Sequence, residues 1–287
     1  MAESTRDIKR RIRGINNIKQ ITKAMELVSS ARLRRARIKL EKSRPYYNTV
    51  YENIKEILGE LGNINHPYLN MRDVERSLYI VITADRGLAG GFNANVNRMV
   101  ENEIRNKKDK VSLIAVGSKG RDYFKSRGYD VKAEFVGMTE NPSFSNARNI
   151  GNIVMEMYEK EEIDEVKIVY TEFISTISQE AKMLKLLPSD SLAEEKSEKK
   201  KSAIVEFEPD ADEVLDYLIP KYIQSVIYGA LIESSCSQQG ARRTAMENAT
   251  DNAEEMTDEL ELSFNRARQA AITTEISEIV TGAEALK

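Results

Sequence analysis

Cysteine and histidine are nearly absent from this 287-residue chain, whose only examples are Cys236 and His66. One cysteine cannot build a disulfide framework, and one residue of each kind cannot build the usual Cys/His zinc cluster. A catalytic triad could use only the single imidazole. His66 stands before a proline, which predicts a surface loop, and we expect Cys236 to be a small surface residue of a helix. Much common enzymology is therefore excluded, and we expect neither a metal nor a cofactor.

Long apolar runs are also missing. No stretch approaches the roughly 20 apolar residues that cross a bilayer, and the basic segment after Met1 leads into no apolar signal core. A composition with 41% hydrophobic and 31% charged residues is typical of a folded protein rather than a disordered one. We therefore expect a chain that stays on the cytosolic side, and the lack of a transit peptide favours a bacterium.

The small net charge of −3 conceals two ends of opposite sign. Residues 1–44 contain fourteen Lys and Arg against four acids, a net charge of +10. Residues 210–287 contain fifteen acids against six Lys and Arg, a net charge of −9. Such an asymmetry indicates partners for both ends, and each end could be a partner of the other.

Proline and glycine are scarce from Thr5 to about Leu58, where only Pro45 and Gly14 occur. Apolar residues recur there at steps of three and four, which predicts a long helix that Pro45 could kink or interrupt near Arg44. The predicted stripe is Ile8, Ile12, Ile15, Ile18, Thr22, Met25 and Val28. The charged stretch 31–40 should be exposed or face something acidic.

A second helical pattern runs from Asp210 to Ala285, and at about 1.5 Å per residue it would be roughly 110 Å long. Its predicted stripe is Val214, Leu218, Ile223, Val226, Ala230, Ala241, Ala245, Ala249, Asn252, Met256, Leu260, Ser263, Ala267, Ala271 and Thr274. The small residues of the second half would let two helices approach closely. We expect this helix and the N-terminal one to pair as an antiparallel coiled coil, with a C-terminal overhang of about 20 residues.

Between these helices, β-branched and aromatic runs alternate with helical segments. Expected strands are 77–83, 111–116, 130–136, 165–173 and 182–187, and expected helices are 93–106, 119–127 and 143–162. This order predicts an α/β fold with a doubly wound, largely parallel, Rossmann-like sheet. The expected domains are 1–58, the N-terminal coiled-coil helix; 74–190, the central α/β domain; 191–209, a charged linker; and 210–287, the C-terminal coiled-coil helix.

The segment from Thr83 to Asn93 follows a strand and opens a helix, which is where phosphate loops lie. It has neither the G-x-G-x-x-G spacing nor the Gly-Lys-Ser/Thr ending of a nucleotide site. A structural turn or a docking surface is therefore the preferred interpretation, and a nucleotide-dependent enzyme is the alternative. A second alternative is a coiled-coil adaptor that binds nucleic acid or other proteins, with binding that depends on the basic stretch Arg32 to Lys39. Aromatic residues for base stacking are absent from Arg6 to Arg44, which argues against nucleic acid.

Three motifs in order resemble the signatures of the ATP synthase gamma subunit family. The first comprises residues 8–12 and 18–28, and the second is the central-domain loop Asp85, Arg86, Gly87, Leu88, Ala89, Gly90, Gly91, Phe92 and Asn93. The third comprises residues 245–246, 249–253, 265–273, 275–276 and 278–280. The resemblance covers nearly the whole chain. It implies a non-catalytic rotary shaft with no small-molecule substrate and no nucleic acid partner, peripheral to the cytoplasmic face of the cell membrane.

The same resemblance implies the partners. The C-terminal overhang would turn inside a head of alpha and beta subunits, which Lys23, Met25, Arg268, Gln269 and Thr273 would contact. The central domain, with Tyr217, Tyr222, Tyr228 and Glu233, would dock on the epsilon subunit and the membrane c-ring. Ion flow through that ring would drive or follow ATP synthesis or hydrolysis.

One segment, residues 234–244, departs from the family pattern. The family usually has a glutamate where Gln238 stands, an alanine at Gly240 and an apolar residue at Arg243. Glycine within a helix costs about 1 kcal/mol relative to alanine, so we expect altered local packing there.

Overall fold

The computed structural model describes residues 4–61, 66–70, 72–189 and 211–285, so the expected linker 191–209 lies outside it. The described chain forms two compact units. One contains residues up to Ser29 together with those from Arg243 onward, and the other contains the described residues from Ser30 to Arg242. Two long helices contribute to both units: α1 (Thr5–Leu61) and α6 (Ala211–Ala285). Pro45 lies inside α1, so the predicted interruption near Arg44 does not occur.

The sheet belongs to the unit of residues 30–242 and has the strand order β3-β2-β1-β4-β5. Its strands are β1 (Ser77–Ile82), β2 (Val111–Val116), β3 (Asp130–Phe135), β4 (Glu165–Phe173) and β5 (Gln179–Leu187). The first four strands are parallel, and β5 returns antiparallel to β4. The strand order reverses between β1 and β4, as in a doubly wound fold.

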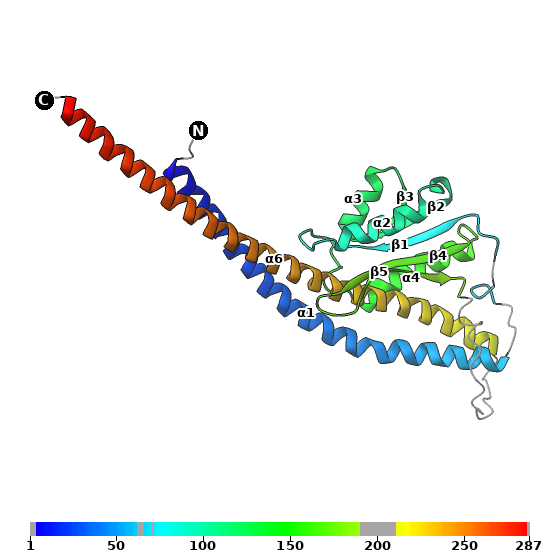
Figure 1. Cartoon of the computed structure of the whole chain (residues 1–287). Helices are drawn as coiled ribbons and strands as arrows, with labels where there is room; N and C mark the ends of the chain where they lie inside the picture. Colours follow the sequence, from blue (N-terminus) through cyan, green and yellow to red (C-terminus); the bar gives the residue numbers. More distant parts are fainter. Residues whose placement is uncertain (1–3, 62–65, 71, 190–210, 286–287) are drawn as a thin grey trace. The chain divides into compact units, whose positions relative to one another are not determined.

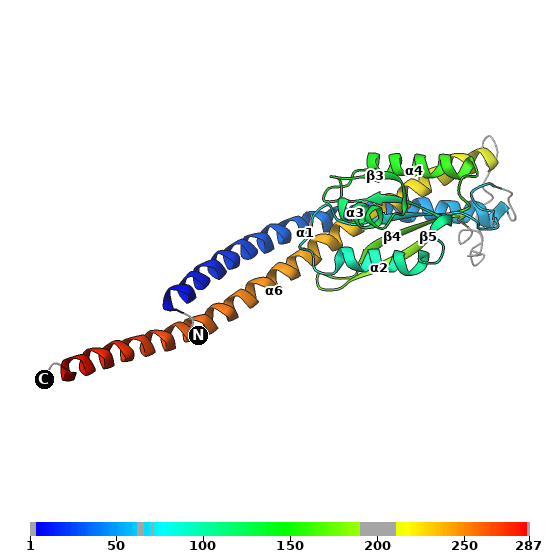
Figure 2. The ribbon, with the colours of Figure 1, turned by 90° about the horizontal axis from the view of Figure 1, so that it is seen from above.

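Alternate residues of β1 point to opposite sides of the sheet, which gives it two apolar faces. Helices cover both faces. On one face, Tyr79 and Val81 pack in a core with α2 (Phe92–Ile104) and α3 (Ser118–Ser126). A short 3₁₀ helix (Lys108–Lys110) directly precedes β2. Leu78, Ile80 and Ile82 pack in a larger core with α4 (Phe144–Glu159) and the first turns of α6. Figures 1 and 2 show these layers around the sheet. The predicted Rossmann-like fold class is confirmed.

His66 and Cys236 were expected at the surface, and both expectations are wrong. His66 is 4% exposed; its Nδ1 accepts a hydrogen bond from the backbone N–H of Tyr68, and its Nε2 lies 3.0 Å from Asp216. Cys236 is buried in a small core with Leu33 and Ile232. Both residues have polar neighbours in the sequence, which predicted exposure. Burial of a side chain depends instead on which elements pack against it in the fold.

In the other unit, α1 and α6 lie side by side in opposite directions (Figures 1 and 2). Lys19 pairs with Glu254 at 2.8 Å. Three residues further along α1, the hydroxyl oxygen of Thr22 lies 2.8 Å from that of Thr250, which precedes Glu254 in α6. The antiparallel pairing is as predicted.

The packing seam of this pair is displaced from the predicted stripes. On α6 the most buried residues are Met246, Thr250, Ala253 and Thr257, a spacing of four and three, while Asn252, Met256 and Ser263 of the predicted stripe are exposed. On α1 the seam keeps Thr22 of the predicted stripe but turns away from Ile18 and Val28, which are more than half exposed, toward Glu26 and Ser29. Apart from Ile8 and Met246, the buried residues of this unit are small or polar. The hydroxyls of Thr250 and Thr257 donate to carbonyls four residues back, which lets them be buried.

Candidate functional site: a polar network between the sheet and the long helices

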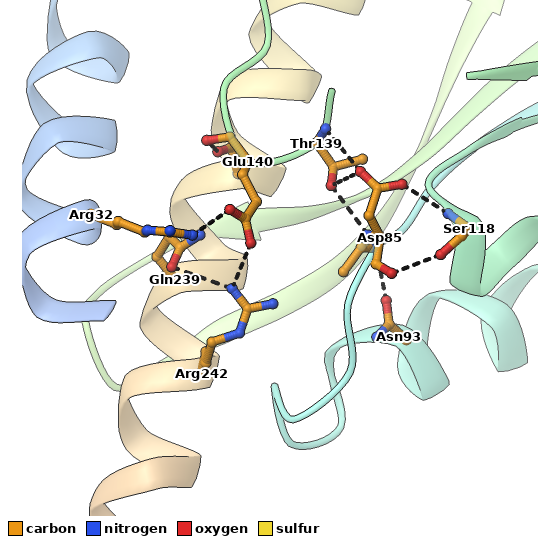
Figure 3. A network of polar contacts seen from close by, with 10 residues as sticks. Arg32, Asp85, Asn93, Ser118, Thr139, Glu140, Gln239 and Arg242 are labelled. Atoms are coloured by element: carbon orange, nitrogen blue, oxygen red, sulfur yellow. Dashed lines mark hydrogen bonds and ion pairs between the residues drawn. The ribbon is translucent and has the colours of Figure 1, made fainter. Parts of the chain in front are cut away.

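Three loops meet at the carboxyl edge of the sheet, after β1, β2 and β3, and Asp85 ties them together. Its carboxylate accepts hydrogen bonds from the backbone N–H of Ser118 (3.1 Å), which opens α3, and from the backbone N–H (3.3 Å) and hydroxyl (2.8 Å) of Thr139. Its own backbone N–H and carbonyl are bonded to the same two residues (Figure 3). One carboxylate thus fixes three consecutive loops.

The position of Asp85 bears directly on the nucleotide alternative. An N–H at the start of a helix beside a parallel sheet is where a phosphate commonly binds. Here the Ser118 N–H donates to the chain's own carboxylate. Burial raises the pKa of Asp85, but the hydrogen bonds from Gly137, Thr139 and Ser118 outweigh burial and hold that pKa below its ordinary value. The carboxylate therefore stays charged at neutral pH and occupies the place of an anionic ligand.

The rest of the predicted family loop is arranged around this anchor. Asn93 accepts a hydrogen bond of 2.8 Å from the backbone N–H of Ala84, which joins the start of α2 to the end of β1. Gly90 has a φ of +54°, in the left-handed region that glycine tolerates, while Gly91 forms the N-cap of α2. Arg86 is exposed and Gly87 is half-buried. These contacts are those of a structural turn, and Arg86 is exposed on it.

The network continues from Thr139 to the next residue, Glu140, which reaches both long helices. Its carboxylate contacts the guanidinium of Arg32 on α1 and lies 3.4 Å from Nη1 of Arg242 on α6. The same Arg242 nitrogen lies 3.4 Å from Gln239 (Figure 3), and Ser235 donates to the Glu140 carbonyl at 3.1 Å. The loop after β3 is therefore bonded to α1 and to α6 at one place.

Arg242 is the most buried cation of this network, with 6% of its surface exposed. Burial lowers the pKa of its guanidinium, and the nearby Glu140 carboxylate opposes that effect. Neither Arg242 nor Glu140 was predicted from the sequence. The sequence does contain a signal for Arg242. It lies four residues after Gln238 and four before Met246, on the inward face of α6, and an arginine buried on that face requires an acidic partner.

The unusual segment of α6 lies against the turn between β4 and β5. A methyl group on Gly240 would approach the Gln179 side-chain nitrogen to 3.1 Å and the Thr176 carbonyl to 3.5 Å, so glycine suits this close approach. Gln238 is 1% exposed, and Arg243 is half-buried and pairs with Glu247 at 3.6 Å. The expected difference in packing at Gly240 thus has a steric cause.

A sequence model of the ATP synthase family matches residues 4–286. The ATP synthase gamma chain of Alkaliphilus metalliredigens is 56% identical, with all of both chains covered. This chain belongs to the ATP synthase gamma chain family. A sodium ion specific gamma chain from Acetobacterium woodii is 49% identical, again with both chains fully covered. A structure described as the central stalk and c-ring of the Tetrahymena thermophila mitochondrial ATP synthase is similar with a TM-score of 0.63 and 28% identity, covering 80% of this chain and 99% of that one.

The five residues that resemble head contacts of gamma chains all belong to the unit of paired helices. Lys23 is exposed and pairs with Glu26 at 3.0 Å, and that hydrogen bond is the main reason why its pKa is raised. Met25 is half-buried. Arg268, Gln269 and Thr273 are exposed on α6, in a stretch where every residue from 268 to 283 is exposed. Their role as contacts stays a prediction.

The four residues that resemble the ring and epsilon side of gamma chains have different environments. Tyr217 is 66% exposed, with the Lys221 ammonium 5.5 Å from its ring centre. Tyr222 is 7% exposed and packs against Tyr51, and Tyr228 packs edge-on against Phe144. Glu233 is half-buried. Of these four, Tyr217 offers the largest surface to a partner.

Proposed function

We propose that this chain is the central rotor shaft of an F-type ATP synthase and that it contains no active site of its own. The observation that carries the proposal is the antiparallel pair of α1 and α6. At the C-terminal end of α6, residues 268–283 are all exposed. A helix end that packs against no other described part of its own chain suits a shaft that turns inside other subunits. Ion flow through a membrane ring would turn the shaft, and the shaft would change the catalytic sites of the head in sequence.

The partners in this proposal are the alpha and beta subunits of the head, the epsilon subunit and the c-ring. Residues 1–58 and 210–287 would form the shaft, and residues 74–190 the domain that docks on epsilon and the ring. The protein would be peripheral at the cytoplasmic face of the membrane. Among the described residues, no helix combines the length and the apolar character needed to span a bilayer. Both close relatives named above are gamma chains of ATP synthases, one of them sodium ion specific.

The surface of the paired helices supports a protein partner. Ile18, Ile21, Leu27 and Val28 of α1 are each at least half exposed, although polar residues fill the seam beside them. Apolar side chains grouped on one helix at this density are commonly covered by another protein. A sleeve of head subunits would cover them while α6 turns with α1.

A network of side chains would carry torque from the sheet to the shaft. Asp85 fixes the loops of the sheet, and Glu140 in one of those loops is bonded to Arg32 of α1 and Arg242 of α6. Because these contacts join three separate elements, rotation of the sheet domain would move both helices. The nucleotide-dependent enzyme is disfavoured, since Asp85 occupies the position at α3 that a phosphate would need.

The proposal is tested by coexpression with the alpha and beta subunits of a close relative. The wild-type chain should copurify as a stoichiometric assembly that hydrolyses ATP. The triple variant Arg268→Ala, Gln269→Ala, Thr273→Ala should reduce hydrolysis at least about tenfold, because three head contacts are lost together. Its thermal unfolding as a free chain should be unchanged, since all three side chains are exposed.

The matched control is Asp258→Ala, an exposed position on the same helix outside the predicted contacts. That variant should assemble and hydrolyse ATP as the wild type does. Failure of the wild-type chain to copurify with the head subunits would count against the rotor, and equal activity of the triple variant and the control would remove the assigned contacts.

A further inference from the structure

A basic pocket lies beside the polar network, within the unit of residues 30–242. It has a volume of about 380 Å³ and is bounded by α1, by the loop after β3 and by α6. Arg32, Arg35 and Lys39 line it from α1, at the three- and four-residue spacing that places side chains on one helix face. Its remaining lining residues are Ala36, Glu140, Asn141, Pro142, Ile232 and Ser235.

The charges of this pocket are not balanced. Glu140 is its only acidic lining residue, and the Glu140 carboxylate is already shared by Arg32 and the buried Arg242. Lys39 donates to the Asn141 side-chain oxygen (3.2 Å) and to the Pro142 carbonyl, which are neutral acceptors. Arg35 makes no hydrogen bond or ion pair with any described residue. Of the four cations in and beside this pocket, Arg32 and Arg242 contact its one carboxylate. Arg35 and Lys39 have no anionic partner in the described part of the chain.

The environment of Lys39 points to a missing anion. Lys39 is half-buried, and burial lowers the pKa of its ammonium with no nearby carboxylate to oppose the effect. Placing a cation in a partly enclosed site is unfavourable unless a charged group pairs with it. Arg35 presents a planar fork of N–H donors suited to two oxygens of one ligand. The pocket thus offers a point charge and a bidentate donor to the same ligand.

We propose that this pocket binds a small oxyanion of the phosphate class, held by Arg35 and Lys39 and completed by Arg32. Phosphate oxygens match both the guanidinium fork and the ammonium. Two negative charges would offset the two cations that have no anionic partner among the described residues. Ala36 and Ile232 form the apolar part of the lining, while Arg35 is exposed and would hold the ligand from the solvent side. Binding would also brace α1 against the loop that carries Glu140, where the sheet meets both helices. The proposal does not depend on the rotor function.

The test is titration of the purified full chain with inorganic phosphate and with pyrophosphate at constant ionic strength. Isothermal calorimetry should give saturable binding, and the melting temperature should rise with ligand concentration. Arg35→Ala should weaken binding at least about tenfold, since a charged bidentate contact is lost. Because the Arg35 side chain bonds to no described residue, the variant should melt at the wild-type temperature without ligand. Lys39→Met should weaken binding in the same direction.

The matched control is Arg34→Ala, which removes an equal charge from an exposed neighbour on α1 that does not line the pocket. It should bind phosphate as the wild type does. Equal weakening of phosphate binding by Arg34→Ala and Arg35→Ala would overturn the site, because the weakening would then follow from the loss of positive charge on α1 and not from a contact in the pocket. No saturable binding of either anion would also overturn it, and protection of Arg35 from phenylglyoxal by head subunits alone would mark the pocket as a protein contact instead. These results leave the coexpression test of the rotor unaffected.

Discussion

Replacement of Gly117 by alanine is expected to destabilise the sheet unit by about 3–5 kcal/mol, because backbone strain and a steric clash act together. Gly117 follows β2 with a φ of +92°, a conformation that other residues rarely adopt. A Cβ atom there would lie 2.4 Å from the Thr83 carbonyl oxygen and 2.8 Å from its carbon. Backbone atoms must move to relieve such a contact, and they belong to the loops that Asp85 joins.

Gly137→Ala separates the two causes of this effect. Gly137 also has a positive φ, of +78°, but a Cβ atom there would meet nothing within 4 Å. We expect that variant to cost only about 1–2 kcal/mol, for backbone strain alone. Urea unfolding of the full chain, followed by circular dichroism, measures both variants. If Gly117→Ala cost no more than Gly137→Ala, the close approach of the loops after β1 and β2 would be wrong.

Replacement of Glu140 by alanine is expected to cost about 2–4 kcal/mol, because it leaves the Arg242 guanidinium buried without an anionic partner. The range extends down to about 2 kcal/mol because the Glu140 side chain is 27% exposed, and solvent weakens its interaction with Arg242. The double variant Glu140→Ala, Arg242→Leu should be more stable than Glu140→Ala alone. Removing the buried charge together with its partner also removes most of the desolvation cost.

A double-mutant cycle over Glu140 and Arg242 measures this coupling by urea unfolding. The control for loss of charge is Glu156→Ala. It removes an exposed carboxylate of α4, in the same unit, that pairs with Lys160. Additive effects of the Glu140 and Arg242 substitutions would show that the carboxylate does not stabilise the buried guanidinium.

Most of the fold could be predicted from the sequence because its signals are local. The expected strands 111–116 and 165–173 coincide with β2 and β4, and the long helices lie where three- and four-residue spacings predicted them. The β5 strand begins at Gln179, earlier than the expected residue 182, because pairing with β4 extends past its apolar part. Pairing partners, rather than composition, set that boundary.

The packing seam could not be predicted from hydrophobicity. Thr22 was placed on the seam correctly, but Ile18 and Val28 face away from it, while Glu26 and Ser29, which were not predicted, lie on it. The most apolar line of a helix normally marks the face that packs within its own chain. That rule fails here because threonine can be buried by bonding to its own helix. Under the proposed function, the outward apolar side chains would pack against other subunits.

The network at Glu140 was missed for a different reason. Its residues come from α1, from a loop 108 positions later and from α6, so no spacing within one segment could reveal it. The loop around Asp85 was found, because a strand followed by glycines and a helix is a local pattern. What that pattern could not indicate is that Asp85 itself would take the position of a bound anion.

The central claim is that α1 and α6 form a single shaft that turns as one body. The Oγ atoms of Thr22 and Thr250 are 2.8 Å apart, close enough for cysteines at both positions to form a disulfide. In the assembly with alpha and beta subunits, Thr22→Cys with Thr250→Cys should oxidise to near completion, while either single variant should not. ATP hydrolysis should be unchanged by the crosslink and by its reduction. Failure of the crosslink to form, or loss of hydrolysis that reduction restores, would contradict the shaft.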